Sequence, residues 1–369
     1  MKSLIEKLTG TFSPSGYEDA IRAVIRKEIT KLADDVRVDA LGNLIARKGP
    51  STGSRYARRT QATRPAAQDG KKVMIAAHMD EIGLMVTHVD SNGFVRFTGI
   101  GGVYPRNLPG GRVRFVNGTV GVIGLEPTDH AEKIPSLDKM FIDVGATDKK
   151  NCPVKTGDVA AFERPFTDLG NLLVAKSMDD RIGCAVAIEV MRALTLRQAQ
   201  GTSTPHEVYF VFTTQEEVGT RGAQTSAYGS DPDRGFSIDV TGWGDTPGQK
   251  DFEVALGKGP AIKIRDGGML SDPRIVEWMI RTAEKSKLPY QREVLLGGTT
   301  DARAMQLVRG GVPVGCISIP CRYVHTPSEM VDYNDVQNAV KLILALLRTP
   351  INLGSVVAGA RGKSSAAIK

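Results

Sequence analysis

The sequence predicts an α/β protein: a three-layer αβα domain with a mostly parallel sheet, and a small all-β domain inserted into it. Apolar strand-like runs alternate with amphipathic helical segments along most of the chain, a pattern typical of a parallel sheet covered by helices. From residue 88 to residue 165 this alternation gives way to short β-like pieces separated by Gly, Asn and Pro, as in small all-β domains. The 369 residues suffice for one large and one small domain.

Four segments carry apolar residues at helical spacing and are predicted as helices. In chain order they are GYEDAIRAVIRKEITKLA (16–33), DDRIGCAVAIEVMRAL (179–194), SDPRIVEWMIRTAEKSK (271–287) and YNDVQNAVKLILALLR (333–348). We expect Ser271 to cap the third of these helices and Pro273 to lie in its first turn.

Four apolar runs are predicted as strands. They are KKVMIAAHMD (71–80), HEVYFVFTTQEE (206–217), FSIDV (236–240) and VPVGCISIP (312–320). Together with the helices, they assign residues 1–87 and 166–354 to the α/β domain and residues 88–165 to the β insertion.

The formal net charge of +7 is concentrated in two segments. Residues 51–72 carry a net +5 and residues 355–369 a net +3, so the rest of the chain is close to neutral. The composition of both suggests disorder, and we expect residues 51–70 to form a flexible basic insertion and residues 355–369 a flexible tail. A basic loop that touches nucleic acid is an alternative. A solvated loop is the favoured interpretation, because the body of the protein is not basic.

Composition also indicates the compartment. No apolar stretch approaches the ~20 residues of a membrane span, and the first residues, MKSLIEKLTG, lack the apolar core of an export signal. The four cysteines do not form a disulfide framework, and Cys316 and Cys321 have no second pair with which to hold a structural zinc ion. We therefore expect a cytoplasmic protein with reduced thiols and no membrane partner.

Polar residues that could carry chemistry lie where predicted strands end or helices begin. His78 follows a buried run, and Asp80 comes two residues later, a spacing at which the carboxylate can fix the histidine tautomer. The motif SMDDRIG places Asp179 and Asp180 at a helix start, where carboxylates commonly cap free N–H groups. Each of these motifs has an ordinary structural interpretation when it stands alone.

Further candidates have the same position relative to the predicted elements. Glu216 and Glu217 stand side by side in TTQEEVGTRGA at the end of a strand, where neighbouring side chains point to opposite faces. The two glutamates should therefore have different roles. Asp239 ends the strand FSIDV, and His325 follows the strand VPVGCISIP within CRYVHTPSE.

Five of these residues together predict a metal site. They are two histidines and three carboxylates at predicted strand–helix junctions: His78, Asp179, Glu217, Asp239 and His325. Ligands of open α/β folds collect at the carboxyl ends of strands. Two histidines and three carboxylates, one of them bridging, are the ligands expected for a pair of Zn²⁺ or Co²⁺ ions that share a water molecule.

These motifs resemble those of the tetrahedral (TET-type) di-metal aminopeptidases, which are also known as glutamyl aminopeptidases and, historically, as endoglucanases. AAHMDEIG, SMDDRIG, TTQEEVGTRGA, FSIDV, GGTTDA and RYVHTPSE occur in the family's order, and the resemblance runs from PSGYE to the last predicted helix. It implies that Asp179, often joined to the next residue by a cis peptide, bridges the two metal ions. The remaining ligands would be His78, Glu217, Asp239 and His325.

The resemblance also implies a mechanism and an assembly. Glu216 would be the general base that acts on a metal-bridging water, with Asp80 beside His78 as a supporting residue. The substrates would be short peptides that lose their N-terminal residue. The β insertion would be PDZ-like, and dimers would assemble into a hollow tetrahedral dodecamer. GGTTDA (297–302) would line the cleft, although Thr299 and Asp301 could instead cap the next helix.

Other functions also fit these residues. A deacylase or carboxypeptidase could use the same two-metal constellation, and release of N-terminal residues from unblocked peptides alone would distinguish an aminopeptidase. Outside enzymes, the β domain could be a binding module on an inactive scaffold, but all ligand types and the base are present. A glycosidase is not favoured, because the site resembles that of a peptidase. The preferred N-terminal residue is left open.

Overall fold

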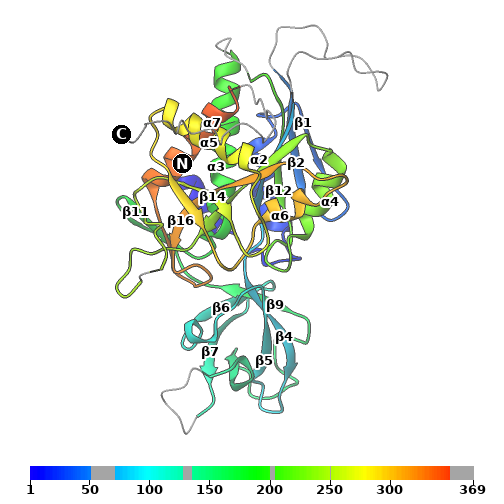
Figure 1. Cartoon of the computed structure of the whole chain (residues 1–369). Helices are drawn as coiled ribbons and strands as arrows, with labels where there is room; N and C mark the ends of the chain where they lie inside the picture. The colour runs from blue at the N-terminus through cyan, green and yellow to red at the C-terminus, as the bar shows by residue number, and fades with distance from the viewer. Residues whose placement is uncertain (51–70, 128–134, 200–203, 250, 350–369) are drawn as a thin grey trace, which may run out of the picture.

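The computed structural model describes residues 1–50, 71–127, 135–199, 204–249 and 251–349. The expected basic insertion, residues 51–70, and the expected tail, residues 355–369, lie outside these ranges. The described chain forms two lobes: an α/β domain and, below it in Figure 1, a β-barrel.

The α/β domain is built on a sheet of eleven strands. Its centre consists of four neighbouring parallel strands, which in spatial order are β12 (Glu207–Thr213), β3 (Lys72–His78), β13 (Arg234–Thr241) and β16 (Val314–Arg322). These strands correspond to the four runs predicted from the sequence. Because they are parallel, their carboxyl ends meet at one edge of the sheet.

The outer strands pair differently, so the expectation of a mostly parallel sheet is wrong and the sheet is mixed. Antiparallel strands form both edges: β2 (Leu44–Lys48) and β1 (Asp35–Val38) on one side, and β17 (Glu329–Asp332), β11 (Leu172–Ala175) and β10 (Thr167–Leu169) on the other. β14 (Ala261–Arg265) pairs antiparallel with β16 and parallel with β15 (Gln291–Val294). Short turns join β1 to β2 and β10 to β11, whereas parallel pairing needs a long crossover.

Helices cover both faces of the sheet, which confirms the three layers. One face carries α1 (Lys2–Thr9), α2 (Asp19–Ile29), α3 (Met178–Ala199), α5 (Pro273–Lys285) and α7 (Tyr333–Leu346). The other face carries α4 (Arg221–Ser230) and α6 (Asp301–Gln306). Among the described residues, no helix is long and apolar enough to cross a membrane.

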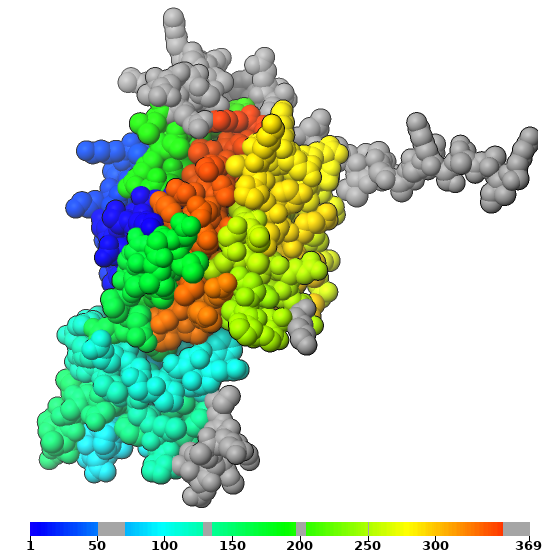
Figure 2. All heavy atoms as spheres, turned by 90° about the vertical axis from the view of Figure 1, so that its left-hand side faces the viewer, coloured from blue at the N-terminus to red at the C-terminus, as the bar shows by residue number. Residues whose placement is uncertain are grey.

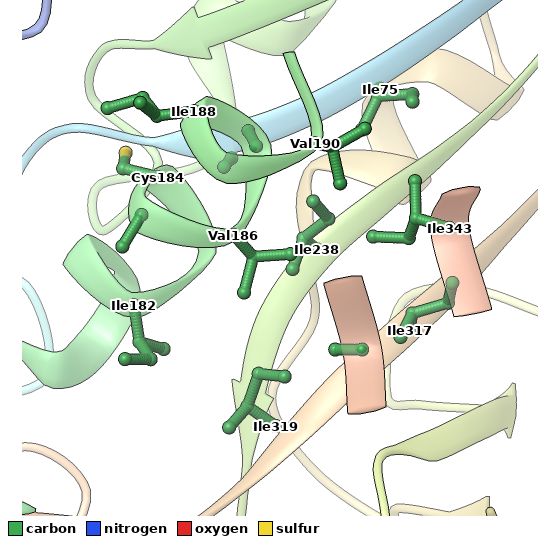
Figure 3. Packing of buried hydrophobic residues seen from close by; sticks show 14 of the residues in the cluster. Ile75, Ile182, Cys184, Val186, Ile188, Val190, Ile238, Ile317, Ile319 and Ile343 are labelled. Atoms are coloured by element: carbon green, nitrogen blue, oxygen red, sulfur yellow. The ribbon is translucent and has the colours of Figure 1, made fainter. Parts of the chain in front are cut away.

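Burial on both faces explains why the central strands are continuously apolar. On β3, Ile75 contributes to the core under the larger helix layer, and Met74 contributes to the core on the opposite face. In the larger core, Val186 and Val190 of α3 pack beside Ile238 of β13 (Figure 3). All four cysteines are free, as expected from the sequence.

The β insertion is a closed barrel of six strands. Its strands are β4 (Gly83–Val89), β5 (Val95–Ile100), β6 (Arg112–Phe115), β7 (Val120–Leu125), β8 (Met140–Asp143) and β9 (Val159–Phe162). The barrel has its own apolar core and stands out from the α/β domain as a separate lobe (Figure 2). Its first strand begins soon after β3 ends, inside the segment that the sequence assigned to the α/β domain. The barrel therefore joins the sheet at the edge where the parallel strands end.

The start of α5 differs from the prediction. Pro273 is its first residue, as expected, but the N-cap is Asp272, whose carboxylate accepts a hydrogen bond from the Arg274 N–H at 2.9 Å. Ser271 does not cap the helix, because its buried hydroxyl donates to the carbonyl oxygen of Lys263 at 2.6 Å. Ser271 is thus bonded to strand β14, and the next residue, Asp272, caps the helix.

Substitution Asp272→Ala should lower the free energy of unfolding by about 1 kcal/mol, the usual contribution of an N-cap. The measurement is urea denaturation followed by circular dichroism. The matched control is Arg274→Ala, which removes the ion pair of that side chain with Asp272 but keeps the capping N–H. Equal effects of the two substitutions would show that the cap contributes nothing beyond the ion pair.

Candidate metal centre

The five predicted metal ligands converge at the edge where the parallel strands end. His78 is the last residue of β3, and Asp239 lies near the end of β13, inside the strand. Glu217 and His325 lie in the loops that follow β12 and β16, and Asp179 lies in the first turn of α3. The topology therefore brings together residues that are far apart in the sequence.

Asp179 lies between the two imidazoles. Its Oδ1 is 2.9 Å from Nε2 of His78, and its Oδ2 is 3.3 Å from Nε2 of His325. The peptide bond from Asp179 to Asp180 is cis, and neither residue has helical backbone angles. One carboxylate oxygen faces each histidine, which is the arrangement required of a ligand that bridges two ions.

Asp180 has a different environment, although its carboxylate lies close enough to His78 and Asp239 to form a three-residue cluster. Its Oδ1 accepts a hydrogen bond from the Gly183 N–H at 3.0 Å, and its Oδ2 accepts one from the His78 N–H at 3.2 Å. Both oxygens are thus used by the main chain. The capping function that is usual for an aspartate pair therefore applies to Asp180, and the contacts with imidazole belong to Asp179.

Glu217 and Asp239 complete the cluster. Oε2 of Glu217 lies 3.2 Å from Nε2 of His325, and Oδ1 of Asp239 lies 4.0 Å from Nε2 of His78. Oε1 of Glu217 is buried and has no hydrogen-bond partner among the described residues. A buried carboxylate oxygen without a partner is unfavourable, so a cation at this position fits the residues present.

The carboxylates also perturb the titration of the histidines. Burial would lower the pKa of His78, but hydrogen bonds to Asp179 and Asp80 outweigh it and raise the pKa well above its usual value. The pKa of His325 is raised in the same way, against burial, by Glu217 and Asp179. Each imidazole lies in surroundings that favour positive charge. A divalent ion that displaces these protons would supply positive charge at the same place.

The two adjacent glutamates do not lie on a strand, so the expectation based on strand alternation does not apply. β12 ends at Thr213, and Gln215 has a left-handed backbone with φ of 55°. The N–H groups of Glu216 and Glu217 donate to the two carboxylate oxygens of Asp80, at 3.0 and 3.1 Å. Asp80 therefore anchors the loop, and the conformation of this loop, not strand alternation, positions the two glutamates.

Asp80 acts mainly on this loop. Its carboxylate also accepts a hydrogen bond from the Ser15 hydroxyl at 2.6 Å. Nδ1 of His78 lies 3.1 Å from the main-chain oxygen of Asp80 and 3.5 Å from the nearer carboxylate oxygen. The main-chain oxygen is thus the closer acceptor for His78, where the sequence led us to expect the carboxylate.

Glu216 lies in the cavity wall beside Asp239. Burial raises the pKa of its carboxyl group well above the usual value, and the negative charges of Asp239, Asp301 and Glu217 raise it further. A raised pKa lets a carboxyl group accept and return a proton near neutral pH.

Glu329 is a site residue that the sequence did not reveal. Its Oε2 accepts a hydrogen bond from the Asp179 N–H at 2.9 Å, and its Oε1 accepts one from the His325 N–H at 2.8 Å. One buried carboxylate therefore fixes the main chain at two predicted ligands. The only available signal was its position in RYVHTPSE, four residues after His325.

The GGTTDA motif starts a helix in a different way from the one expected. The N-cap of α6 is Thr300, whose side chain accepts a hydrogen bond from the Ala302 N–H. Asp301 is the first helical residue and accepts a hydrogen bond from the Thr213 hydroxyl in the interior. Thr299 lines the cavity with its two preceding glycines, as the sequence led us to expect.

A cavity of about 900 Å³ opens above this cluster. Its wall includes Asp179, Glu216, Glu217, Asp239 and His325 from the α/β domain. The barrel contributes residues from the segment 102–107. The volume lies at the upper end of the range for small-molecule sites, so a short peptide can enter it.

Two imidazoles and several buried carboxylates at the floor of an open cavity define the centre of a metal-dependent enzyme. The chain belongs to the M42 glutamyl aminopeptidase family, whose model matches residues 60–342. It is a metal-dependent aminopeptidase, a hydrolase of peptide bonds.

Related proteins cover nearly the whole chain. The lysyl aminopeptidase of Pyrococcus furiosus is 35% identical over 362 residues, which are 93% of this chain and 96% of that protein. An aminopeptidase of the archaeon Desulfurococcus kamchatkensis is similar in structure, with a TM-score of 0.85, 39% identity and coverage of 96% and 98% of the two chains. The TET1 peptidase of Pyrococcus horikoshii, which can assemble into a tetrahedron or a large octahedral shell, has a TM-score of 0.80 and 32% identity, with coverage of 94% and 98%.

Substitution Asp179→Asn should reduce the metal content of the protein, because an amide cannot offer one anionic oxygen to each of two ions. We expect two ions per chain in the wild type after equilibration with Zn²⁺ and dialysis, and fewer than one in the variant, measured by elemental mass spectrometry. The control is Asp168→Asn, on β10, where the carboxylate pairs with Lys2 at the surface. A folded Asp179 variant with the metal content of the wild type would contradict the bridging role.

Proposed function

We propose that this enzyme releases N-terminal residues from short peptides with two divalent ions, Zn²⁺ or Co²⁺, and Glu216 as general base. The observation that carries the proposal is the position of Asp179 between His78 and His325, with one carboxylate oxygen toward each. An anionic bridge with an imidazole on either side suits a pair of ions better than a single ion.

The remaining ligands divide between the two histidines. His78 would share one ion with Asp239, its neighbour at 4.0 Å, and His325 would share the other with Glu217, its neighbour at 3.2 Å. Asp179 would contribute to both. Imidazole and carboxylate groups are ligands that both Zn²⁺ and Co²⁺ accept, so this donor set does not discriminate between the two metals.

Glu216 would move the proton during hydrolysis. When bound, the two ions would polarise the scissile carbonyl group and lower the pKa of the attacking water. Glu216 accepts a proton from this water as its oxygen adds to the carbonyl carbon. It then donates the proton to the leaving amine nitrogen as the C–N bond breaks. The products are a free amino acid and a peptide shortened by one residue.

Substitution Glu216→Gln should lower kcat by about two orders of magnitude or more, because general-base catalysis contributes on that scale. Metal content should stay at the wild-type level, since Glu216 is not a proposed ligand. The assay is release of the N-terminal amino acid from an unblocked peptide, with its N-acetylated form as the negative control. Near-normal turnover at full metal occupancy would exclude Glu216 as the base, and equal cleavage of both peptides would point to another amide hydrolase.

We also propose that the chain assembles through its barrel, which would be PDZ-like, into dimers and then into a dodecamer. Val120 and Val122 are exposed on β7, and Val116 is exposed in the turn after β6. Exposed apolar side chains on a small domain favour burial against a partner. The similarity to the TET1 peptidase of Pyrococcus horikoshii supports an assembly of many chains.

Light scattering of the purified protein should report a mass near twelve times the 39.7 kDa of one chain. Substitution Val122→Lys should reduce this mass, because a charged side chain on β7 would oppose burial of that surface. Val38→Lys, which introduces the same charge at an exposed valine of β1, is the control. A wild-type monomer with full activity would contradict the assembly.

A further inference from the structure

Buried residues form one part of the cavity wall above the metal centre and exposed residues another, and we call these parts its closed end and its open end. At the closed end the wall contains Thr241 and Lys263, whose exposed fractions are 3% and 1%. The open end includes the barrel, where Tyr104 is 49% exposed. An enzyme that removes one residue from a chain end needs a closed end for that residue. A peptide held in this way would extend toward the exposed part of the wall, to which the barrel contributes.

The barrel segment that borders the open end is held directly against the metal centre. Gly101 has φ of 76°, and a Cβ atom there would lie 3.1 Å from the Glu217 side chain. A Cβ atom at Gly102 would overlap the imidazole of His325. The ring of Tyr104 lies against the same imidazole, with 6.0 Å between the ring centres. The short turn Pro105–Asn107 follows directly after Tyr104.

Arg106, in the middle of this turn, supplies a cation without a counter-charge. Its side chain lines the cavity and makes no ion pair with any residue that the structure describes. Lys263, the other long basic side chain in the wall, donates to Glu293, which also accepts a hydrogen bond from Thr241. The positive charge at the closed end is therefore compensated, whereas the charge of Arg106 is available to a ligand.

We propose that Arg106 binds the C-terminal carboxylate of short peptide substrates, and that it thereby makes the enzyme prefer short peptides with a free C-terminus. The proposal rests on the aminopeptidase function, because that function sets the direction of the peptide in the cavity. A guanidinium group can form two parallel hydrogen bonds to a carboxylate. In a peptide of a few residues, this carboxylate is the one anionic group that every substrate carries on the open side.

The test compares peptides that differ only at the C-terminus. The N-terminal residue is first chosen with a panel of aminoacyl-nitroanilides, and is then followed by one, two or three glycines that end in a free acid or an amide. For at least one length, the wild type should have a KM for the acid about tenfold below that for the amide. Arg106→Gln should raise the KM of the acid to near that of the amide, and Arg106→Lys should give an intermediate value because it keeps the charge alone.

The control variant is Arg112→Gln, which removes a barrel arginine outside the cavity that lies near Glu163. It should leave the ratio of the two KM values as in the wild type. Equal KM values for acid and amide in the wild type at all three lengths would overturn the proposal. So would an Arg106→Gln variant that raises both KM values equally, since Arg106 would then only shape the cavity. A wild type that releases no N-terminal residue from any of these peptides would instead refute the proposed function.

Discussion

The carboxylate of Asp179 is shared between His78 and His325, and the surrounding structure holds these three groups in position from several directions. Glu329 binds the main-chain N–H groups of Asp179 and His325. Asp180 accepts hydrogen bonds from the main-chain N–H groups of His78 and of Gly183 in α3. Each supporting group is a carboxyl group that accepts hydrogen bonds from two main-chain N–H groups, so the main chain around the site is held at several points.

The same arrangement concentrates negative charge in the interior. Carboxylates that are buried within a few ångströms of one another repel, and each has lost its contact with water. Protonated imidazoles at His78 and His325 offset part of this charge, and divalent ions would offset more. Metal binding and the stability of this edge of the sheet are therefore linked, since ions that bind only the folded chain stabilise it.

The sequence predicted the features that have a local signal. The four central strands were found because burial on both faces leaves a continuous apolar run. The antiparallel pairing at the sheet edges was not predicted, because the direction of pairing depends on turns and on strands that are distant in the chain. Glu329 escaped notice because its hydrogen-bond partner Asp179 is 150 residues away. Ser271 and Asp272 are both good capping residues, so only the contact of the serine with the sheet decides between them. The left-handed residue Gln215, which takes the two glutamates off the strand, has no sequence signature.

Gly101 and Gly102 let two separately cored lobes share one wall without a side chain between them. The width of the cleft is thus set by the angle at which the barrel meets the sheet, and not by the ligands alone. A larger residue at position 102 would force the imidazole of His325 or the barrel segment to move, while each lobe kept its own core. The protein would fold, and its active site would nevertheless be misshapen. The contact between the two lobes must therefore keep its geometry as closely as the reacting groups do, although neither glycine takes part in the chemistry.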